Sequence, residues 1–252
     1  MRRVEHLLRA TARAETRHFW FRGFRAFVMP LLQHAAAGRP DTRLLDCGCG
    51  TGANVELLDT FGRAYGFDLA ETGLRIGREA GRTRLARATV AAVPFPTAAF
   101  DIVTSFDVLY SLADRDEQAA IAEMYRLLKP GGFAIVNVAA MRMLRGDHSV
   151  LSREVRRYGR GELRTRMERA GFLVQRLTYT NATLFPALAI ARLIQRRRGL
   201  RREPEADAEI SVPPAPINAI MTGVMRLEAL WLRAFDAPFG SSLLCLARKP
   251  LS

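Results

Sequence analysis

The chain has 252 residues, of which 49% are hydrophobic and 25% charged, and it carries a formal net charge of +13. This composition is that of a globular protein with one sizeable core. It excludes a membrane-spanning protein, because no window approaches the roughly 20 apolar residues that such a helix needs. Its three cysteines indicate neither a disulfide framework nor a zinc site.

The basic charge is almost entirely arginine, because Lys129 and Lys249 are the only lysines in the sequence. We expect much of this charge to be solvated surface, although anionic membranes or anionic substrates would also suit it. The N-terminal stretch, MRRVEHLLRATARAETRHFWFRGF, lacks the uninterrupted apolar core of a signal peptide. A reducing cytoplasm is therefore the expected location.

The predicted elements begin with helical structure over residues 1–36, after which strands and helices alternate from Arg43. This alternation is typical of a doubly wound, mostly parallel α/β sheet with helices on both faces. The seven expected strands cover 44–47, 64–69, 85–90, 100–106, 133–138, 172–180 and 241–248. The expected helices cover 53–60, 114–128, 161–170, 184–198 and 217–235, and a further helix opens near residue 71.

Two local signals predict where the helix over 114–128 begins and ends. Asp114 is expected to cap its N-terminus, with Glu117 as the capping-box partner three residues later. The sequence Lys-Pro-Gly-Gly at 129–132 is expected to stop the helix before the fifth strand.

The most informative stretch is RLLDCGCGTGANVELL, residues 43–58, in which Asp46 precedes glycines at 48, 50 and 52. A strand that ends in a glycine-rich turn before a helix is where open α/β sheets bind ligands. Asp68, twenty residues after Gly48, matches the acid of a dinucleotide fingerprint, so a nicotinamide oxidoreductase is one alternative. Asp46 argues against that alternative, because a carboxylate there opposes a pyrophosphate and attracts an ammonium group.

Five motifs follow one another in a fixed order, and together they carry a resemblance. They are LLDCGCGTG at 44–52, GFDLA at 66–70, VAAVPFPTAAFDIV at 90–103, SFDVLYSL at 105–112 and LLKPGG at 127–132. With them the chain resembles the class I S-adenosylmethionine-dependent methyltransferases of the small-molecule type. The resemblance implies a Rossmann-like fold, S-adenosylmethionine as cofactor, S-adenosylhomocysteine as product, and no metal.

The resemblance also implies where the cofactor binds. Asp68 would bind the ribose hydroxyls and Leu69 would lie beside the adenine. The remaining cofactor residues expected on this basis are Asp46, Gly48, Cys49, Gly50, Gly52, Ala91, Ala92 and Phe106. Separately from the resemblance, the guanidinium of Arg22, within the N-terminal aromatic cluster, is a candidate charge-assisted partner of the cofactor carboxylate.

The chain departs from the family pattern at two places. The segment 88–92 reads Ala-Thr-Val-Ala-Ala where relatives often carry an acid that contacts the adenine amino group. Tyr110-Ser111 stands where many relatives have Glu-His, so a base expected after the fourth strand is missing. A methyltransferase-like scaffold without turnover is therefore a second hypothesis, against which the intact glycines and Asp68 count.

The flanks resemble a bacterial subgroup of the family, through HFWFRGFR at 18–25 and RRYGRGELRTRMERAGF from residue 156. We expect one methyltransferase domain over 1–252. Its parts are a helical lid at 1–40, a cofactor-binding core at 41–180, a helical insertion covering the substrate at 181–239, and the final strand at 240–252.

Candidate residues for the reaction lie in the lid and after the fifth strand. His148 and His18 are the candidate bases, because an imidazole can take a proton from a hydroxyl or amine nucleophile. Candidate substrate-binding residues are Trp20, Tyr110, Arg157 and Tyr158. Each has a structural alternative: an aromatic that packs in the core, or a histidine or arginine in a solvated loop.

The sequence thus predicts transfer of a methyl group from S-adenosylmethionine to a small-molecule, lipid-linked or glycan-linked acceptor, with oxygen as the preferred acceptor atom. The arginine-rich segment ARLIQRRRGLRR, 191–202, beside the apolar LFPALAI, is expected either to rest on an anionic bilayer or to be a solvated helix end. Nucleic acid, and with it an RNA methyltransferase, is less favoured because no RNA-binding module is recognisable.

Overall fold

The computed structural model describes residues 2–145, 149, 154–198 and 211–251. Its described helices are α1 (Arg2–Ala14), α2 (Phe19–Ala36), α3 (Ala53–Leu58), α4 (Glu71–Glu79), α5 (Asp114–Leu127), α7 (Arg160–Arg169), α8 (Phe185–Arg197) and α10 (Ala215–Trp231). Its strands are β1 (Arg43–Cys47), β2 (Arg63–Asp68), β3 (Leu85–Arg87), β4 (Phe100–Phe106), β5 (Leu128–Ala139), β6 (Leu173–Thr180) and β7 (Ser242–Arg248). Short 3₁₀ turns lie at Leu109–Ser111 and Arg142–Leu144.

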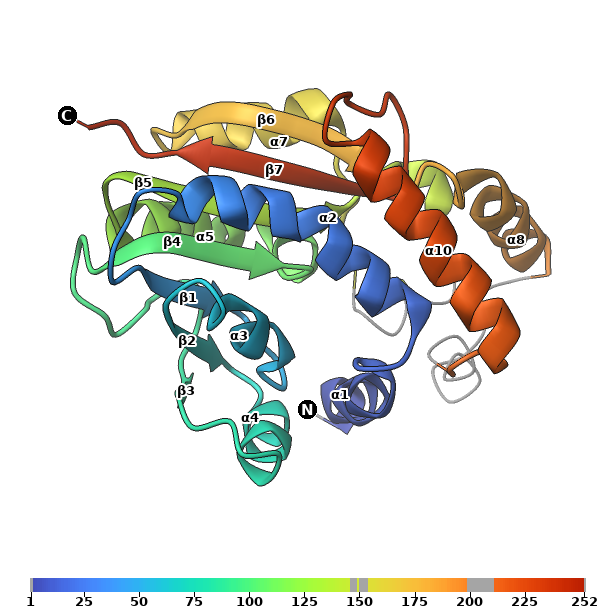
Figure 1. The fold of residues 1–252 in the computed structure, drawn as a ribbon, viewed down its shortest axis with the longest axis horizontal. Helices are drawn as coiled ribbons and strands as arrows, with labels where there is room; N and C mark the ends of the chain where they lie inside the picture. The colour runs from blue at the N-terminus through green and yellow to red at the C-terminus, as the bar shows by residue number, and fades with distance from the viewer. Residues whose placement is uncertain (1, 146–148, 150–153, 199–210, 252) are drawn as a thin grey trace.

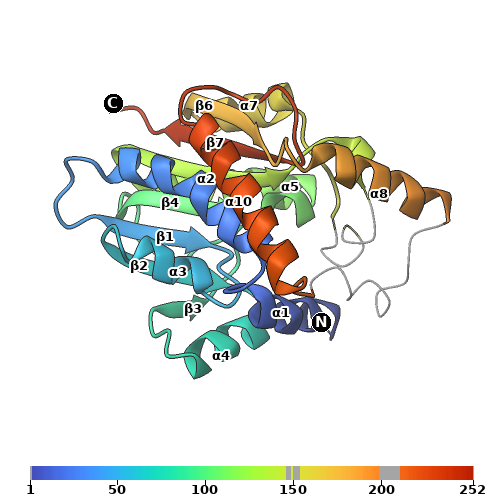
Figure 2. The same ribbon diagram turned by 45° about the vertical axis from the view of Figure 1, so that its right-hand side comes forward.

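The strands form one seven-stranded sheet in the order β3-β2-β1-β4-β5-β7-β6. The pairs from β3 to β5 are parallel, whereas β7 runs antiparallel to both β5 and β6. Helices α2, α3 and α10 lie on one face and α5 and α7 on the other (Figures 1 and 2). The predicted doubly wound, mostly parallel sheet, with helices inserted before its last strand, is confirmed.

The strand β4 lies at the centre because its sequence FDIVTSF is buried at every position. Its carboxyl end and that of β1 are next to each other, since Asp46 pairs in register with Thr104. The sheet therefore brings the glycine turn after β1 and the residues after β4 to one edge, where ligands bind in such folds.

The N-terminal helical stretch consists of two helices, and α10 holds the junction between them. The Asn218 amide donates to the Arg17 carbonyl oxygen at 2.8 Å, and its Oδ1 accepts from the Phe19 backbone N–H at 2.7 Å. Further along, a Cβ on Gly23 would lie 2.3 Å from the Met225 methyl carbon, so only glycine allows this close helix contact. These contacts fix the start of α2 over the sheet edge.

The predicted bounds of α5 are confirmed to within one residue, since the helix covers Asp114–Leu127, but its predicted cap is wrong. Ala113 is the N-cap, Asp114 is the first helical residue with no side-chain cap, and Glu117 bonds to other elements instead of closing a capping box. The fifth strand starts earlier than predicted, because β5 begins at Leu128, directly after the helix. Its pairing with β4 shifts from Phe100 opposite Leu128 to Ile102 opposite Phe133. Residues 129–132 therefore lie within β5, where its pairing with β4 is irregular.

The third strand is also shorter than predicted, since β3 ends at Arg87. Residues beyond it turn back, with the Ala92 N–H donating to the Thr89 carbonyl oxygen at 3.3 Å. In this local bridge Thr89 and Ala92 bond to each other, whereas in a longer strand their backbone groups would have paired with β2.

Candidate active site

The turn after β1 has the backbone that its glycines predict. Gly48, Gly50 and Gly52 have φ of 82°, 56° and 81°, in the left-handed region that glycine adopts without strain. A Cβ on Gly48 would lie 2.4 Å from a methyl carbon of Val108, which follows β4. The turn is thus pressed against the segment that leaves the central strand.

Asp46 carries the strongest sign of a ligand in this turn. Its side chain is 1% exposed; Oδ1 accepts from the Thr104 hydroxyl at 2.7 Å, and Oδ2 is buried with no hydrogen-bond partner among the described residues. Burial raises the pKa of Asp46 to about 7, against the lowering effect of the Thr104 hydrogen bond. An unpartnered buried carboxylate oxygen is costly, and the ammonium group of a ligand would satisfy it.

Asp68 ends β2 and ties it to the glycine turn. Its Oδ2 accepts from the Gly50 N–H and its Oδ1 from the Ala70 N–H, both at 2.8 Å. Burial raises the pKa of this carboxyl. Each carboxylate oxygen can accept a second hydrogen bond, so ribose hydroxyls can still bind here.

The other predicted cofactor residues are distributed around this turn. Leu69, beside Asp68, is 64% exposed, whereas Cys49 is buried and burial raises the pKa of its thiol. Ala91 and Ala92 lie in the tight turn after β3. The residues present therefore fit an adenosyl amino acid, with the unpartnered oxygen of Asp46 for its ammonium group.

Helix α1 covers the turn from the outside. A Cβ on Gly50 would lie 3.4 Å from a methyl carbon of Leu8, and the Thr51 hydroxyl donates to Glu15 at 2.5 Å. Arg82 binds the same Glu15 at 3.1 Å and thereby joins α1 to the end of α4. Both ribbon views show α1 alongside α4 (Figures 1 and 2).

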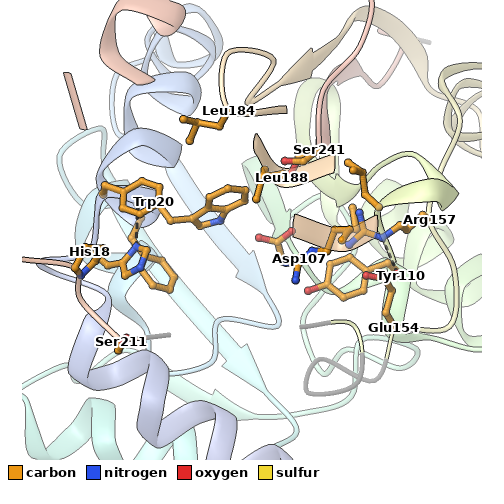
Figure 3. A pocket seen from close by; sticks show the side chains of 17 residues that line it. His18, Trp20, Asp107, Tyr110, Glu154, Arg157, Leu184, Leu188, Ser211 and Ser241 are labelled. Carbon is orange, nitrogen blue, oxygen red and sulfur yellow. Dashed lines mark hydrogen bonds and ion pairs between the residues drawn. The ribbon is translucent and has the colours of Figure 1, made fainter. Parts of the chain in front are cut away.

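A cavity of about 500 Å³ opens at the carboxyl ends of β4 and β5 (Figure 3). The start of α2, the end of β5, the start of β7 and one side of α8 form its walls. The lining residues used below are His18, Trp20, Asp107, Tyr110, Arg157, Leu184, Leu188 and Ser241. The wall is mainly apolar, with a few polar groups at one end, as is usual for small-molecule sites.

Of the predicted residues, His18, Trp20, Tyr110 and Arg157 line this cavity. His18 caps α2, because its Nδ1 accepts from the Trp20 N–H at 3.1 Å, and burial lowers its pKa. Arg157 is held by the Ala140 carbonyl oxygen at 2.9 Å and by Glu154 at 2.7 Å.

Other predicted residues lie elsewhere. Tyr158 is fully buried and its hydroxyl donates to Glu117, so this hydroxyl serves the interior and not the cavity. Phe106 packs edge to face on Phe24, with ring centroids 5.0 Å apart, and Arg22 is exposed on the first turn of α2. His148 lies outside the described residues.

Sequence reasoning missed Asp107, the first residue after β4. It lines the cavity, and its Oδ1 accepts from the Asn137 amide at 2.9 Å. The side chain is open to the cavity, but desolvation by the surrounding protein raises the pKa of Asp107 to about 6, while the Asn137 hydrogen bond and the charge of Arg157 lower it. The signal that would have found it is its place directly after a buried parallel strand, where ligand-binding residues gather.

The sequence matches a known protein family over residues 45–136, the methyltransferase domain. It is 36% identical over 116 residues to the ubiquinone/menaquinone biosynthesis C-methyltransferase UbiE of Shewanella halifaxensis, covering 40% of this chain and 44% of the relative. It is 32% identical over 122 residues to a protein of Mycolicibacterium smegmatis described as a probable S-adenosylmethionine-dependent methyltransferase, covering 48% and 45%. The chain thus spans less than half the length of these relatives.

Among solved structures, the fold is similar to the methyltransferase in complex with the Haloferax volcanii Trm112 methyltransferase activator. The TM-score is 0.58 at 19% identity, and the match covers 96% of this chain and 97% of that one. At this identity the likeness concerns the fold alone. The glycine turn, the strand order and the match together lead to one conclusion: residues 45–136 are a methyltransferase domain of the class I S-adenosylmethionine-dependent type.

Proposed function

We propose that the protein transfers the methyl group of S-adenosylmethionine to a small molecule bound in the cavity, with oxygen as the preferred acceptor atom. The observation that carries this proposal is the unpartnered Oδ2 of Asp46 beside the glycine turn. Val108 connects the two sites, because it packs on Gly48 and directly follows Asp107 of the cavity wall. A donor in the turn and an acceptor in the cavity would therefore be neighbours.

When bound, the cofactor supplies an electrophilic methyl group on a cationic sulfur. The protein's contribution is to align the acceptor with this group and to exclude water. In our proposal Asp46 meets the cofactor's ammonium, Asp68 its ribose, and Leu69 its adenine. The lid at 1–40 and the insertion at 181–239 enclose the acceptor, because the starts of α2 and α8 line the cavity.

Calorimetry with the two forms of the cofactor tests this function. We expect both S-adenosylmethionine and S-adenosylhomocysteine to bind with one site per chain, and NAD to give no heat. No affinity for either adenosyl compound would overturn the proposal and favour the scaffold hypothesis, while binding of NAD alone would favour an oxidoreductase.

We place the enzyme in the cytoplasm, with α8 touching the inner face of the membrane. Within the described part of the chain, none of the helices has both the length and the apolar content that crossing a bilayer requires. Helix α8 nevertheless leaves Ile190, Leu193 and Ile194 each more than half exposed, and Arg197 follows them on the same face. An apolar stripe bordered by arginine suits an anionic lipid surface.

Sedimentation with lipid vesicles measures this contact. We expect the protein to sediment with phosphatidylglycerol vesicles and to stay in solution with phosphatidylcholine ones, because the arginines add charge attraction to apolar burial. Changing the three exposed apolar residues of α8 to serine should release it. A matched control changes Ile217, Ile220 and Leu227, which are also exposed but lie on α10. Equal sedimentation with both lipids would contradict this placement.

A further inference from the structure

The carboxylate of Asp107 is held in one position by the neighbouring strand. The Asp107 N–H donates to the Asn137 carbonyl oxygen at 3.0 Å, and the Asn137 amide donates back to Asp107 Oδ1 at 2.9 Å. Asp107 has a φ of 61°, which is unfavourable for a residue with a side chain. Such strain tends to persist at functional sites, where surrounding contacts fix it.

The second oxygen of this carboxylate is available to a ligand. The described residues give Oδ2 no hydrogen bond, and the side chain is open to the cavity. Figure 3 shows it at the polar end of the cavity, with Tyr110 and Arg157 on one side and Trp20 across from it. A hydrogen-bond donor on a bound molecule can therefore reach Oδ2.

A second polar group faces the same space. Ser241, directly before β7, is 8% exposed and lines the cavity, yet its hydroxyl has no hydrogen-bond partner among the described residues. The cavity is also lined by Trp20, which lies across from Asp107, and by Leu184 and Leu188, which add apolar surface (Figure 3). The cavity thus fits a molecule with an apolar ring at one end and hydroxyl groups at the other.

We propose that Asp107 is a catalytic residue that takes the proton from an aromatic hydroxyl acceptor, with Ser241 binding a second polar group of that acceptor. This inference rests on the proposed methyl transfer. The acceptor oxygen forms the new bond to the methyl carbon, and the carbon–sulfur bond breaks with its electron pair staying on sulfur. The hydroxyl proton passes to Asp107 Oδ2, leaving a methyl ether and S-adenosylhomocysteine, and is then lost to water.

Asp107 suits this role better than the predicted base His18. The following residue, Val108, touches the cofactor turn at Gly48, whereas His18 uses its Nδ1 to cap α2. The charged groups around Asp107 are Arg157, already paired with Glu154, and Arg192 from α8. A carboxyl pKa of about 6 also makes Asp107 a stronger base than an ordinary aspartate, while leaving it ionised above neutral pH.

A comparison of phenol with toluene, which has a similar shape but no hydroxyl, tests the contact between the ligand hydroxyl and Asp107 directly. The protein is first loaded with S-adenosylhomocysteine, and its aspartate carboxyls are followed by NMR. We expect phenol to bind at least about 10-fold more tightly than toluene, because its hydroxyl donates to a charged oxygen, and to move the Asp107 resonance. In Asp107→Asn the two ligands should bind alike, whereas the exposed control Asp116→Asn should behave as wild type.

Measurements of turnover distinguish a catalytic base at Asp107 from a residue that only binds the acceptor. With S-adenosylmethionine, we expect wild type to convert phenol to anisole with an acidic limb near pH 6, and Asp107→Asn to lose about 100-fold or more in kcat together with that limb. Equal affinity for phenol and toluene in wild type, or full turnover by Asp107→Asn, would overturn the role of Asp107. Failure to bind S-adenosylhomocysteine would instead overturn the proposed function.

Discussion

Replacing Asp46 with asparagine is expected to weaken binding of S-adenosylmethionine by about 10- to 100-fold at pH 8. The reason is the loss of a charge-assisted hydrogen bond, because asparagine keeps the shape and the Thr104 contact but offers no negative charge to the ammonium group. Calorimetry on wild type and Asp46→Asn measures the effect. Unchanged affinity would mean that the ligand's amino group binds elsewhere.

The same substitution should change how stability depends on pH. The folded pKa of Asp46 is about 7 against an ordinary value of 3.8, so between these values the folded state keeps a proton that the unfolded chain has lost. Wild type therefore loses stability as pH rises from about 4 to 7, by up to about 4 kcal/mol from this group. Asp46→Asn should lack that loss.

Urea unfolding at pH 5 and pH 8 measures this difference. We expect the gap in the free energy of unfolding between the two pH values to be smaller in Asp46→Asn than in wild type. Asp116→Asn, an exposed aspartate on α5, serves as the control and should leave the gap unchanged. An identical gap in Asp46→Asn would show that Asp46 titrates normally.

Replacing Glu117 with alanine is expected to lower the free energy of unfolding by about 3–5 kcal/mol, the largest stability effect we predict. Glu117 is fully buried and accepts hydrogen bonds from the Tyr158 hydroxyl and from Arg156 and Arg166. These bonds connect α5 to α7 and to the segment that precedes α7. Without the carboxylate, the buried Tyr158 hydroxyl loses its acceptor, and Arg156 and Arg166 keep only more exposed acidic partners, Asp114 and Glu162.

Chemical denaturation of Glu117→Ala and Glu168→Ala tests this expectation. Glu168 also pairs with an arginine, but it lies on the surface of α7, so its loss should cost less than about 1 kcal/mol. Similar losses in the two variants would contradict the view that the Glu117 cluster is a main stabilising contact of this region. Binding of S-adenosylhomocysteine serves as the check that Glu117→Ala remains folded.

The sheet was predictable where local pattern and burial agree. The mostly apolar stretch at β4 and the glycine turn at residues 48–52 can be recognised in the sequence, because a central strand is buried on both faces and a tight turn needs bare backbone. The break between α1 and α2 was not predictable, since Asn218, two hundred residues away, holds the junction. Likewise Glu117 matched a capping box, but partners from α7 and the preceding segment took its carboxylate.

The candidate site also has a part that was predictable from local sequence and a part that was not. The cofactor turn lies within a short stretch, and the resemblance to a family pointed to Asp46 and Asp68 directly. Asp107 stands close to Tyr110 and Ser111, where the chain departs from the family pattern, yet its significance depends on Asn137 and on a cavity built by four distant elements. The sequence places Tyr158 in a loop, which favours substrate binding, and only the fold shows that its hydroxyl faces inward.

The position of β7 has a consequence for how the molecule is assembled during synthesis. β7 is made after β6, yet it inserts between β5 and β6. Until residues 242–248 have been synthesised, one edge of β5 is therefore unpaired and β6 has no neighbour in the sheet. Such long-range pairing is slow, and unpaired edges invite aggregation meanwhile. Ser241 directly precedes this strand and lines the cavity. We therefore expect the part of the sheet around the glycine turn to fold first, and the cavity for the acceptor to be completed only when β7 pairs.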